Sequence, residues 1–164
     1  MTESARDPAP EPLCSRKRVG WGDLDGNGHM RNTAWLDAGS TARMEAFAAL
    51  GVTPADFARA GVGPVIRSDH IVYLAEAHLL EDLTVTVELA GLSSDGRRFL
   101  VRNRFFKADG RPAAVLTSRG GWLDLRARRL VPPPDKLADA LARWPRSDDY
   151  RHLDDEPDDS EARP

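Results

Sequence analysis

Two Asp-Gly pairs, Asp95-Gly96 and Asp109-Gly110, constrain the fold of this 164-residue chain more than any other feature. Asp-Gly favours the tight turn of a β-hairpin, because both residues tolerate the backbone angles that such turns need. Residues 83–89 alternate apolar and polar side chains with the period of two that is typical of a half-buried strand. The sequence therefore predicts four long antiparallel strands, at residues 66–77, 83–92, 97–107 and 112–125.

A long helix is predicted before these strands, at residues 33–50. The segment contains no proline, its apolar and small residues recur at helical spacing, and Gly51 is a natural stop. An antiparallel sheet must bury its apolar face, and this helix is the one long element available to cover it. We therefore expect an α+β fold in which the antiparallel sheet wraps around one long central helix.

Three shorter elements complete the predicted domain: a strand at residues 16–21, a helix from Thr53 to Gly61, and an amphipathic helix at residues 135–144. One central helix covers only part of a sheet, and the edge strands lack partners within the chain. Unpaired edges favour pairing with a second copy. We therefore expect a homodimer or a homotetramer.

The composition at the two ends predicts a flexible leader at residues 1–12 and an acidic, disordered tail at residues 147–164, on either side of one domain at residues 13–146. Cys14 is the sole cysteine, so no internal disulfide can form, and no Cys/His spacing is typical of a zinc site. We expect neither a metal nor a cofactor.

The patterning of the chain also excludes some partners. No apolar run approaches the roughly 20 residues of a membrane span, and the N-terminal residues lack the basic-then-apolar order of a signal peptide. We therefore expect a cytoplasmic protein without a membrane partner. No basic stripe is interleaved with aromatic residues, so we expect no nucleic-acid partner either.

A polar loop at residues 21–32 precedes the long helix and carries polar side chains at every second position: Asp23, Asp25, Asn27 and His29. One interpretation is structural, because Asp and Asn form turns and cap helices. A second is calcium binding, because the loop matches the first half of an EF-hand. The second half does not match, since Ala34 stands where a bidentate Glu is required.

A third interpretation of the loop is acyl-transfer chemistry. A carboxylate could attack a carbonyl carbon or activate a water molecule. The free N–H groups at the start of the long helix would then stabilise the oxyanion. Such chemistry favours a good leaving group, for example the thiolate of a thioester.

The chain resembles the hotdog-fold acyl thioesterases over about residues 16–125. The resemblance is carried by the loop Asp-Leu-Asp-Gly-Asn-Gly-His-Met-Arg-Asn, the helix start Trp35-Leu-Asp-Ala-Gly-Ser-Thr-Ala-Arg43, Tyr73 before Glu81-Asp82, and Asp95-Gly96-Arg97-Arg98. It is similar both to the 4-hydroxybenzoyl-CoA thioesterase-like and to the acyl-ACP (acyl-carrier-protein) thioesterase-like members. The resemblance implies a long helix wrapped by an antiparallel sheet, and hydrolysis of an acyl-CoA or acyl-carrier-protein thioester.

The resemblance also implies site residues. Asp25 corresponds to the catalytic carboxylate, as nucleophile or general base. Asn27 would orient substrate or water, and His29 would hold the carboxylate or relay a proton. The further acidic residue of the plant enzymes follows a Tyr-x-x-Glu pattern, which here ends at Glu76.

Phosphate of coenzyme A or of a phosphopantetheine arm would contact Arg97 and Arg98. The chain departs from the family pattern at Arg31 and Trp35, beside the expected acyl pocket, and by an insert at residues 51–63.

Further aromatic and histidine residues have two interpretations. Trp35, Phe47, Phe57 and Tyr73 line the acyl site or belong to the core. We expect structural roles for Asp23, His70 and His78. Two rival functions stay open: a hotdog domain that binds acyl groups without cleaving them, and a calcium-binding loop.

Overall fold

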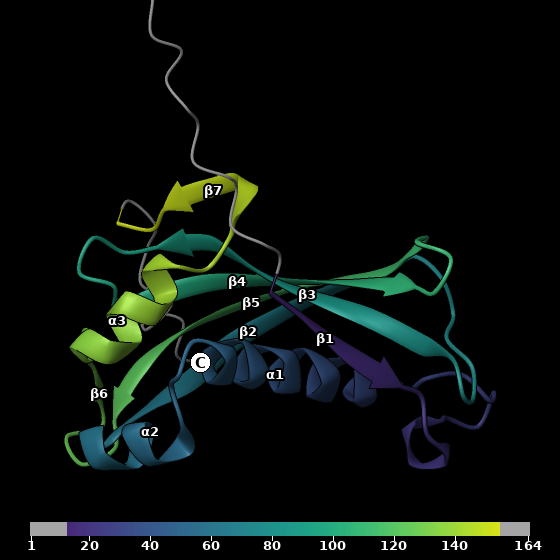
Figure 1. Ribbon diagram of the computed structural model, residues 1–164, viewed down its shortest axis with the longest axis horizontal. Coiled ribbons are helices and arrows are strands. Elements are labelled where there is room, and N and C mark those ends of the chain that lie inside the picture. The colour runs from purple at the N-terminus through teal and green to yellow at the C-terminus, as the bar shows by residue number, and fades with distance from the viewer. Residues whose placement is uncertain (1–12, 155–164) are drawn as a thin grey trace, which may run out of the picture.

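The computed structural model describes residues 13–154, and one long helix lies along one face of a curled sheet (Figure 1). The elements follow in the order β1 (Leu13–Arg18), a 3-10 turn η1 (Trp21–Asp23), α1 (Asn32–Ala49), α2 (Pro54–Ala60), β2 (Val62–Tyr73), β3 (Asp82–Leu92), β4 (Arg98–Lys107), β5 (Pro112–Asp124), β6 (Arg129–Leu130), α3 (Asp135–Ala142) and β7 (Arg146–His152).

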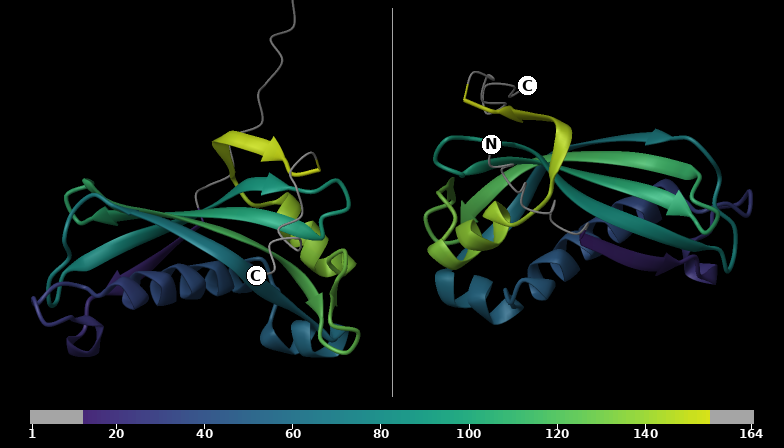
Figure 2. Two further views of the ribbon diagram at one scale, coloured as in Figure 1. Left: turned by 180° about the vertical axis from the view of Figure 1, so that it is seen from behind. Right: turned by 45° about the horizontal axis from the view of Figure 1, so that its top comes forward.

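The main strands run in the order β1-β3-β4-β5-β2, and every neighbouring pair along this path is antiparallel. Both expected hairpin turns form, with Gly96 and Gly110 at positive φ. Two views show α1 inside the curl of the sheet (Figure 2). The predicted antiparallel sheet wrapped around one long helix is therefore confirmed.

The face of α1 that meets the sheet is built from small residues and two aromatic rings. The closest approach is at Gly39, where an added Cβ would lie 2.6 Å from Leu116 Cδ2 of β5. Trp35 and Phe47 are buried on the same face. Small side chains therefore let the helix axis approach the sheet while the two rings fill the space at either end.

A buried cation crosses this contact between helix and sheet. The Arg43 side chain donates from Nη1 to Asn103 Oδ1 (3.0 Å) and to Ser118 Oγ (2.9 Å), and from Nη2 to Ser40 Oγ (2.9 Å). Ser118 Oγ donates in turn to Asp69 Oδ1, 2.5 Å away. Burial lowers the pKa of Arg43, and the charge of Asp69 acts in the opposite direction. Helix α1 is thus joined to β4, β5 and β2 by one polar network.

The C-terminal segment corrects the expected domain boundary. Residues 146–152 form β7, which pairs in parallel with the second half of β3, so the expectation of a disordered tail is wrong for residues 147–152. Leu153 is fully buried against Ala90 and Leu100. The acidic composition of residues 147–164 gave no indication that Leu153 packs against the sheet. The expected leader, and the remainder of the tail at residues 155–164, lie outside the described residues.

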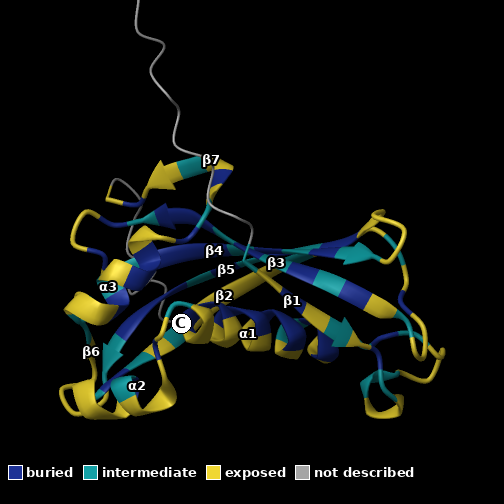
Figure 3. Cartoon of the chain, viewed as in Figure 1, coloured by how far each residue is buried: buried dark blue, intermediate teal, exposed yellow. Residues whose placement is uncertain are grey.

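Strand β2 forms an outer edge of the sheet, and many of its residues are exposed (Figure 3). The large apolar residues on or next to β2 with at least 39% of their surface exposed are Ile66, Val72, Tyr73 and Leu74. This edge therefore offers both unpaired backbone groups and apolar area to another chain.

Among residues 13–154, no helix is long and apolar enough to cross a membrane.

Candidate functional site

The loop between η1 and α1 is closed by the carboxylate of Asp25. Asp25 Oδ1 accepts hydrogen bonds from the backbone N–H of Asn27 (2.8 Å) and of His29 (3.1 Å). The Asp25 N–H donates to the His29 carbonyl, 2.8 Å away, and Gly28 takes a positive φ at the tip. The two backbone N–H groups lower the pKa of Asp25, so this exposed side chain is a carboxylate at neutral pH.

Asp23 shapes the start of the same loop. Its Oδ2 accepts from the Gly20 N–H (2.8 Å) and lies 2.6 Å from Lys17 Nζ. Burial raises the pKa of Asp23, but the hydrogen bonds from Lys17 and Gly20 outweigh it and the pKa is lowered. An ammonium group and backbone donors thus occupy one oxygen of each of the two carboxylates, Asp23 Oδ2 and Asp25 Oδ1. The loop geometry favours the turn-forming interpretation over the calcium-binding one.

A cavity of about 420 Å³ opens beside this loop, at the start of α1. Its lining residues come from the loop, the first turn of α1 and the end of β2: Asp25, His29, Met30, Asn32, Trp35, Tyr73, Leu74, Ala75 and Glu76. The first backbone N–H groups of a helix lack intrahelical acceptors and can bind an oxyanion. The cavity therefore combines a carboxylate, an imidazole and a helix N-terminus with an apolar wall.

The structure brings three of the four expected catalytic residues to this cavity. Asp25, His29 and Glu76 line it, and His29 Nε2 lies 3.3 Å from Glu76 Oε2. The Asn27 side chain is exposed and does not line the cavity. Trp35 and Tyr73 line it with rings 6.1 Å apart. Phe47 and Phe57 instead belong to the core at the other end of α1, in contact with each other and with Trp122.

The histidine His78 also lies at this site, where sequence reasoning expected only a structural residue. Its backbone forms a bridge with that of His29, and the two rings meet edge to face at 5.0 Å. His78 Nε2 lies 3.8 Å from Glu76 Oε2, and its Nδ1 lies 3.5 Å from Glu81 Oε2. The signal in the sequence is its place two residues after Glu76, where the chain leaves β2.

Glu81 fixes this histidine from the other side. Its carboxylate accepts from Lys107 Nζ at 2.9 and 3.0 Å and from the His78 N–H at 2.7 Å. Burial raises the pKa of Glu81, but the bonds from Lys107 and the His78 N–H outweigh it, so the pKa is lowered. Glu81 is thus an anion that holds both the backbone and the ring of His78.

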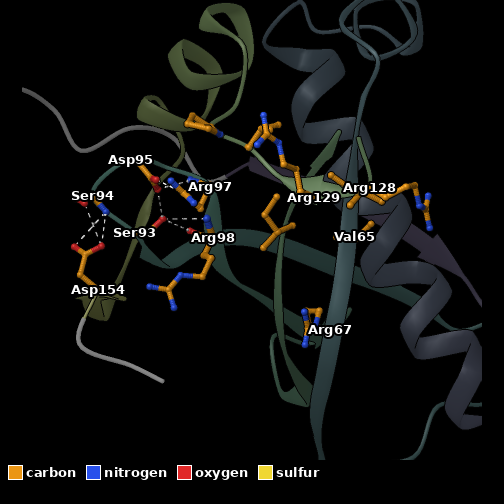
Figure 4. Close-up of a pocket in the computed structure, with 14 residues that line it drawn as sticks. Val65, Arg67, Ser93, Ser94, Asp95, Arg97, Arg98, Arg128, Arg129 and Asp154 are labelled. Atoms are coloured by element: carbon orange, nitrogen blue, oxygen red, sulfur yellow. Dashed lines mark hydrogen bonds and ion pairs between the residues drawn. The ribbon is translucent and has the colours of Figure 1, made fainter. Parts of the chain in front are cut away.

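The two expected phosphate-binding residues line a different, larger cavity of about 1000 Å³ (Figure 4). Arg97 pairs with Asp95, and Arg98 donates from Nη2 to the Leu153 carbonyl at 2.8 Å. The structure adds three arginines from distant segments to the lining: Arg67, Arg128 and Arg129. Within residues 13–154, none of these three has a carboxylate within the 4.0 Å of an ion pair.

Arg67 lies in β2, Arg128 in the turn between β5 and β6, and Arg129 in β6. The β5–β6 turn lies at the opposite end of the sheet from the Asp25 loop (Figure 1). Arg128 has a positive φ of 56°, a conformation that costs a non-glycine residue about 1 kcal/mol or more. Sequence reasoning missed all three because no local motif joins residues so far apart along the chain.

The sequence model of the thioesterase-like superfamily matches residues 19–141 of this chain. No curated protein matches the chain significantly in sequence.

Solved structures share the architecture at low sequence identity. A hypothetical protein from Staphylococcus aureus in complex with CoA superposes with a TM-score of 0.74 at 18% identity, over 86% of this chain and 90% of that one. A 1,4-dihydroxy-2-naphthoyl-CoA thioesterase from Synechocystis gives 0.72 at 17% identity, over 80% of this chain and 96% of that one. A gentisyl-coenzyme A thioesterase gives 0.69 at 18% identity, over 78% of this chain and 98% of that one. Similarity at this level of identity shows the fold alone.

Proposed function

Because the chain belongs to the thioesterase-like superfamily and has the hotdog fold, we propose that it hydrolyses an acyl thioester to a free acid and a thiol. The observation that carries the proposal is the cavity at the start of α1, lined together by Asp25, His29 and Glu76. Three residues from two separate segments of the sequence converge there beside the N-terminus of α1. The two named thioesterases of the same fold act on CoA thioesters, which supports this reaction class.

Asp25 is the reacting carboxylate in this proposal. Its Oδ1 is held by two backbone N–H groups, and no residue within 13–154 donates a hydrogen bond to its Oδ2. As a nucleophile, Oδ2 attacks the thioester carbon, the thiolate leaves, and water cleaves the resulting anhydride. As a general base, it takes a proton from the water that attacks the same carbon. In both cases the backbone N–H of Asn32, at the start of α1 and in the cavity lining, binds the carbonyl oxygen as it becomes negative.

His29 and Glu76 act on the same reaction from the cavity rim. The 3.3 Å between His29 Nε2 and the Glu76 carboxylate supports a role of His29 in holding or relaying a proton. Asn27 contributes through its backbone N–H, which donates to Asp25 Oδ1. We therefore assign Asn27 the role of a positioning residue for the carboxylate.

The arginine-lined cavity binds phosphate of CoA or of a carrier protein's phosphopantetheine arm. Arg97 and Arg98 lie there with three further arginines that have no ion-pair partner among the described residues. A solved structure of the same fold contains CoA. Guanidinium groups suit phosphate because they bind two of its oxygens at once.

The two cavities lie toward opposite ends of β2, which supports an assembly of two copies. Arg67 lines the arginine cavity and Tyr73 the Asp25 cavity, roughly 20 Å apart at the rise of a strand. Antiparallel pairing of β2 with the β2 of a second copy would bring the partner's arginine cavity toward the Asp25 cavity. The exposed apolar residues of β2 favour this pairing, and the assembly is a homodimer or a homotetramer.

The test is thiol release from short, long and aromatic acyl-CoA substrates and from acyl-carrier protein. Asp25→Asn keeps an oxygen that accepts the two loop hydrogen bonds but removes the charge, so kcat/KM should fall about a hundredfold or more in a folded protein. Asp109→Asn is the matched control, because Asp109 also accepts a backbone N–H in an exposed turn, from Arg111 at 3.0 Å. This control should keep full activity.

Three outcomes separate the alternatives. Unchanged turnover in folded Asp25→Asn contradicts the role of Asp25. Acyl-CoA binding without turnover in the wild type supports a hotdog domain that binds acyl groups without cleaving them. Sedimentation velocity on the same samples tests the assembly, and a monomer would contradict the pairing through β2.

A further inference from the structure

We propose that His29, Glu76 and His78 form a binding site for a divalent transition metal, zinc above all. The three side chains place one ligand atom each within 4.8 Å of the others. Two imidazoles and one carboxylate are the protein ligands of one class of zinc centres, which keep the fourth position open. Neither the superfamily match nor the named structures assign a metal to this site.

The distances are compatible with an ion shared by the three side chains. Glu76 Oε2 lies 3.3 Å from His29 Nε2 and 3.8 Å from His78 Nε2, so one oxygen faces two ring nitrogens. The longer distance exceeds that of a hydrogen bond. A tetrahedral centre with bonds of about 2.0–2.2 Å holds its ligand atoms roughly 3.3–3.5 Å apart. Small rotations of exposed side chains would complete that geometry.

The backbone preorganises both histidines. His29 and His78 are joined by a β-bridge, and Met30 N–H donates to the Ala77 carbonyl at 2.8 Å. The loop before α1 and the segment after β2 therefore lie side by side before any metal arrives. Only side-chain freedom is lost on binding, which favours affinity.

Glu81 supplies the outer contact that metal-binding histidines usually have. Its Oε2 lies 3.5 Å from His78 Nδ1, on the ring edge opposite the Nε2 that faces Glu76. A carboxylate at this nitrogen fixes the ring orientation and raises the basicity of the other nitrogen. Lys107 holds Glu81 in turn. The site thus has three ligands and one positioning residue.

The ligand atoms are accessible to an ion from solvent. The exposed fractions of the side chains are 32% for His29, 63% for Glu76 and 54% for His78. His29 and Glu76 also line the Asp25 cavity, so the open coordination position would face it. The metal would link the loop before α1 to the end of β2 at the cavity mouth.

The experiment is calorimetric titration with Zn²⁺, together with thermal unfolding, on the full chain. All variants carry Cys14→Ser, because Cys14 is an exposed thiol that could bind zinc by itself. We expect one zinc per chain and a rise in Tm of roughly 5–10 °C at a hundredfold excess over Kd. Titration with Co²⁺ should give the visible absorption of a four-coordinate centre with nitrogen and oxygen ligands.

Matched histidine variants locate the site. His78→Gln should weaken zinc binding by about a hundredfold or more, and Glu81→Gln by roughly tenfold to a hundredfold. His70→Gln is the control, because His70 is an exposed histidine of β2 that is not part of the cluster. It should bind zinc as the parent does.

Either of two results would overturn the proposal: no heat and no Tm shift in the parent, or equal affinity in the parent and His78→Gln. The first would leave the cluster as hydrogen-bonded side chains without a metal. These readouts measure binding and not turnover, so their failure would leave the proposed hydrolysis untouched.

Discussion

Replacing Arg43 by methionine should destabilise the core by about 3 kcal/mol, because it removes the donors of two fully buried acceptors. Asn103 and Ser118 are each 0% exposed and each accept a hydrogen bond from Arg43 Nη1. Each buried polar group left without a partner costs about 1–3 kcal/mol. The methionine variant no longer buries the charge of Arg43, and the desolvation penalty that this removes offsets part of the cost of the two unpaired acceptors. For a domain of this size the Tm should fall by roughly 10 °C.

The assay is thermal unfolding followed by circular dichroism on Arg43→Met, Ser118→Ala and the double variant. The double variant should lose at least about 0.5 kcal/mol less than the sum of the two single variants, because the partners share one network. Arg59→Met is the control for the substitution itself, since Arg59 is an exposed arginine whose side chain is 78% accessible. A fall in Tm below about 2 °C for Arg43→Met, or strict additivity in the double variant, would refute the reasoning.

Two further predictions concern acid sensitivity and the C-terminal strand. The folded-state pKa of Glu81 is below its ordinary value of 4.5. Ionised Glu81 therefore stabilises the fold above pH 4.5, and this contribution is lost as the pH falls through the folded-state pKa. The Tm, measured from pH 6 to pH 3, should fall less steeply in Glu81→Gln than in the wild type. Leu153→Ala should cost about 2–4 kcal/mol in urea denaturation, because Leu153 is 0% exposed. An unchanged midpoint would show that β7 does not pack on β3.

The sequence predicted those elements whose signals are local. Helix α1 was expected at residues 33–50 and spans Asn32–Ala49, because its spacing and its stop at Gly51 are both local features. Strand β2 spans Val62–Tyr73 and not residues 66–77, and it includes Pro64, a residue type that is usually confined to strand ends and edges. Proline is tolerated there because β2 is an edge strand and its missing N–H leaves no ladder bond unmade on the open side. Only the tertiary position of β2 could have shown this.

The candidate site was predictable where one motif carried it. Asp25 and His29 come from one loop, and Glu76 follows from the Tyr-x-x-Glu pattern. His78 was missed because its contacts depend on the bridge to His29. The added arginines of the large cavity were missed because β2 and the β5–β6 turn meet only in the folded chain.

The parallel strand β7 also protects the molecule from aggregation. It occupies the half of the β3 edge that β1 leaves open, an edge that would otherwise be a template for strand pairing between unrelated molecules. β7 is itself a new edge, but its residues include Asp148 and Asp149, and charges of this kind discourage further strands from adding. The charged side chains of β7, two Asp and two Arg, therefore make it an edge strand that resists further pairing. Transient opening of β7 would expose this half of the β3 edge to pairing with another chain.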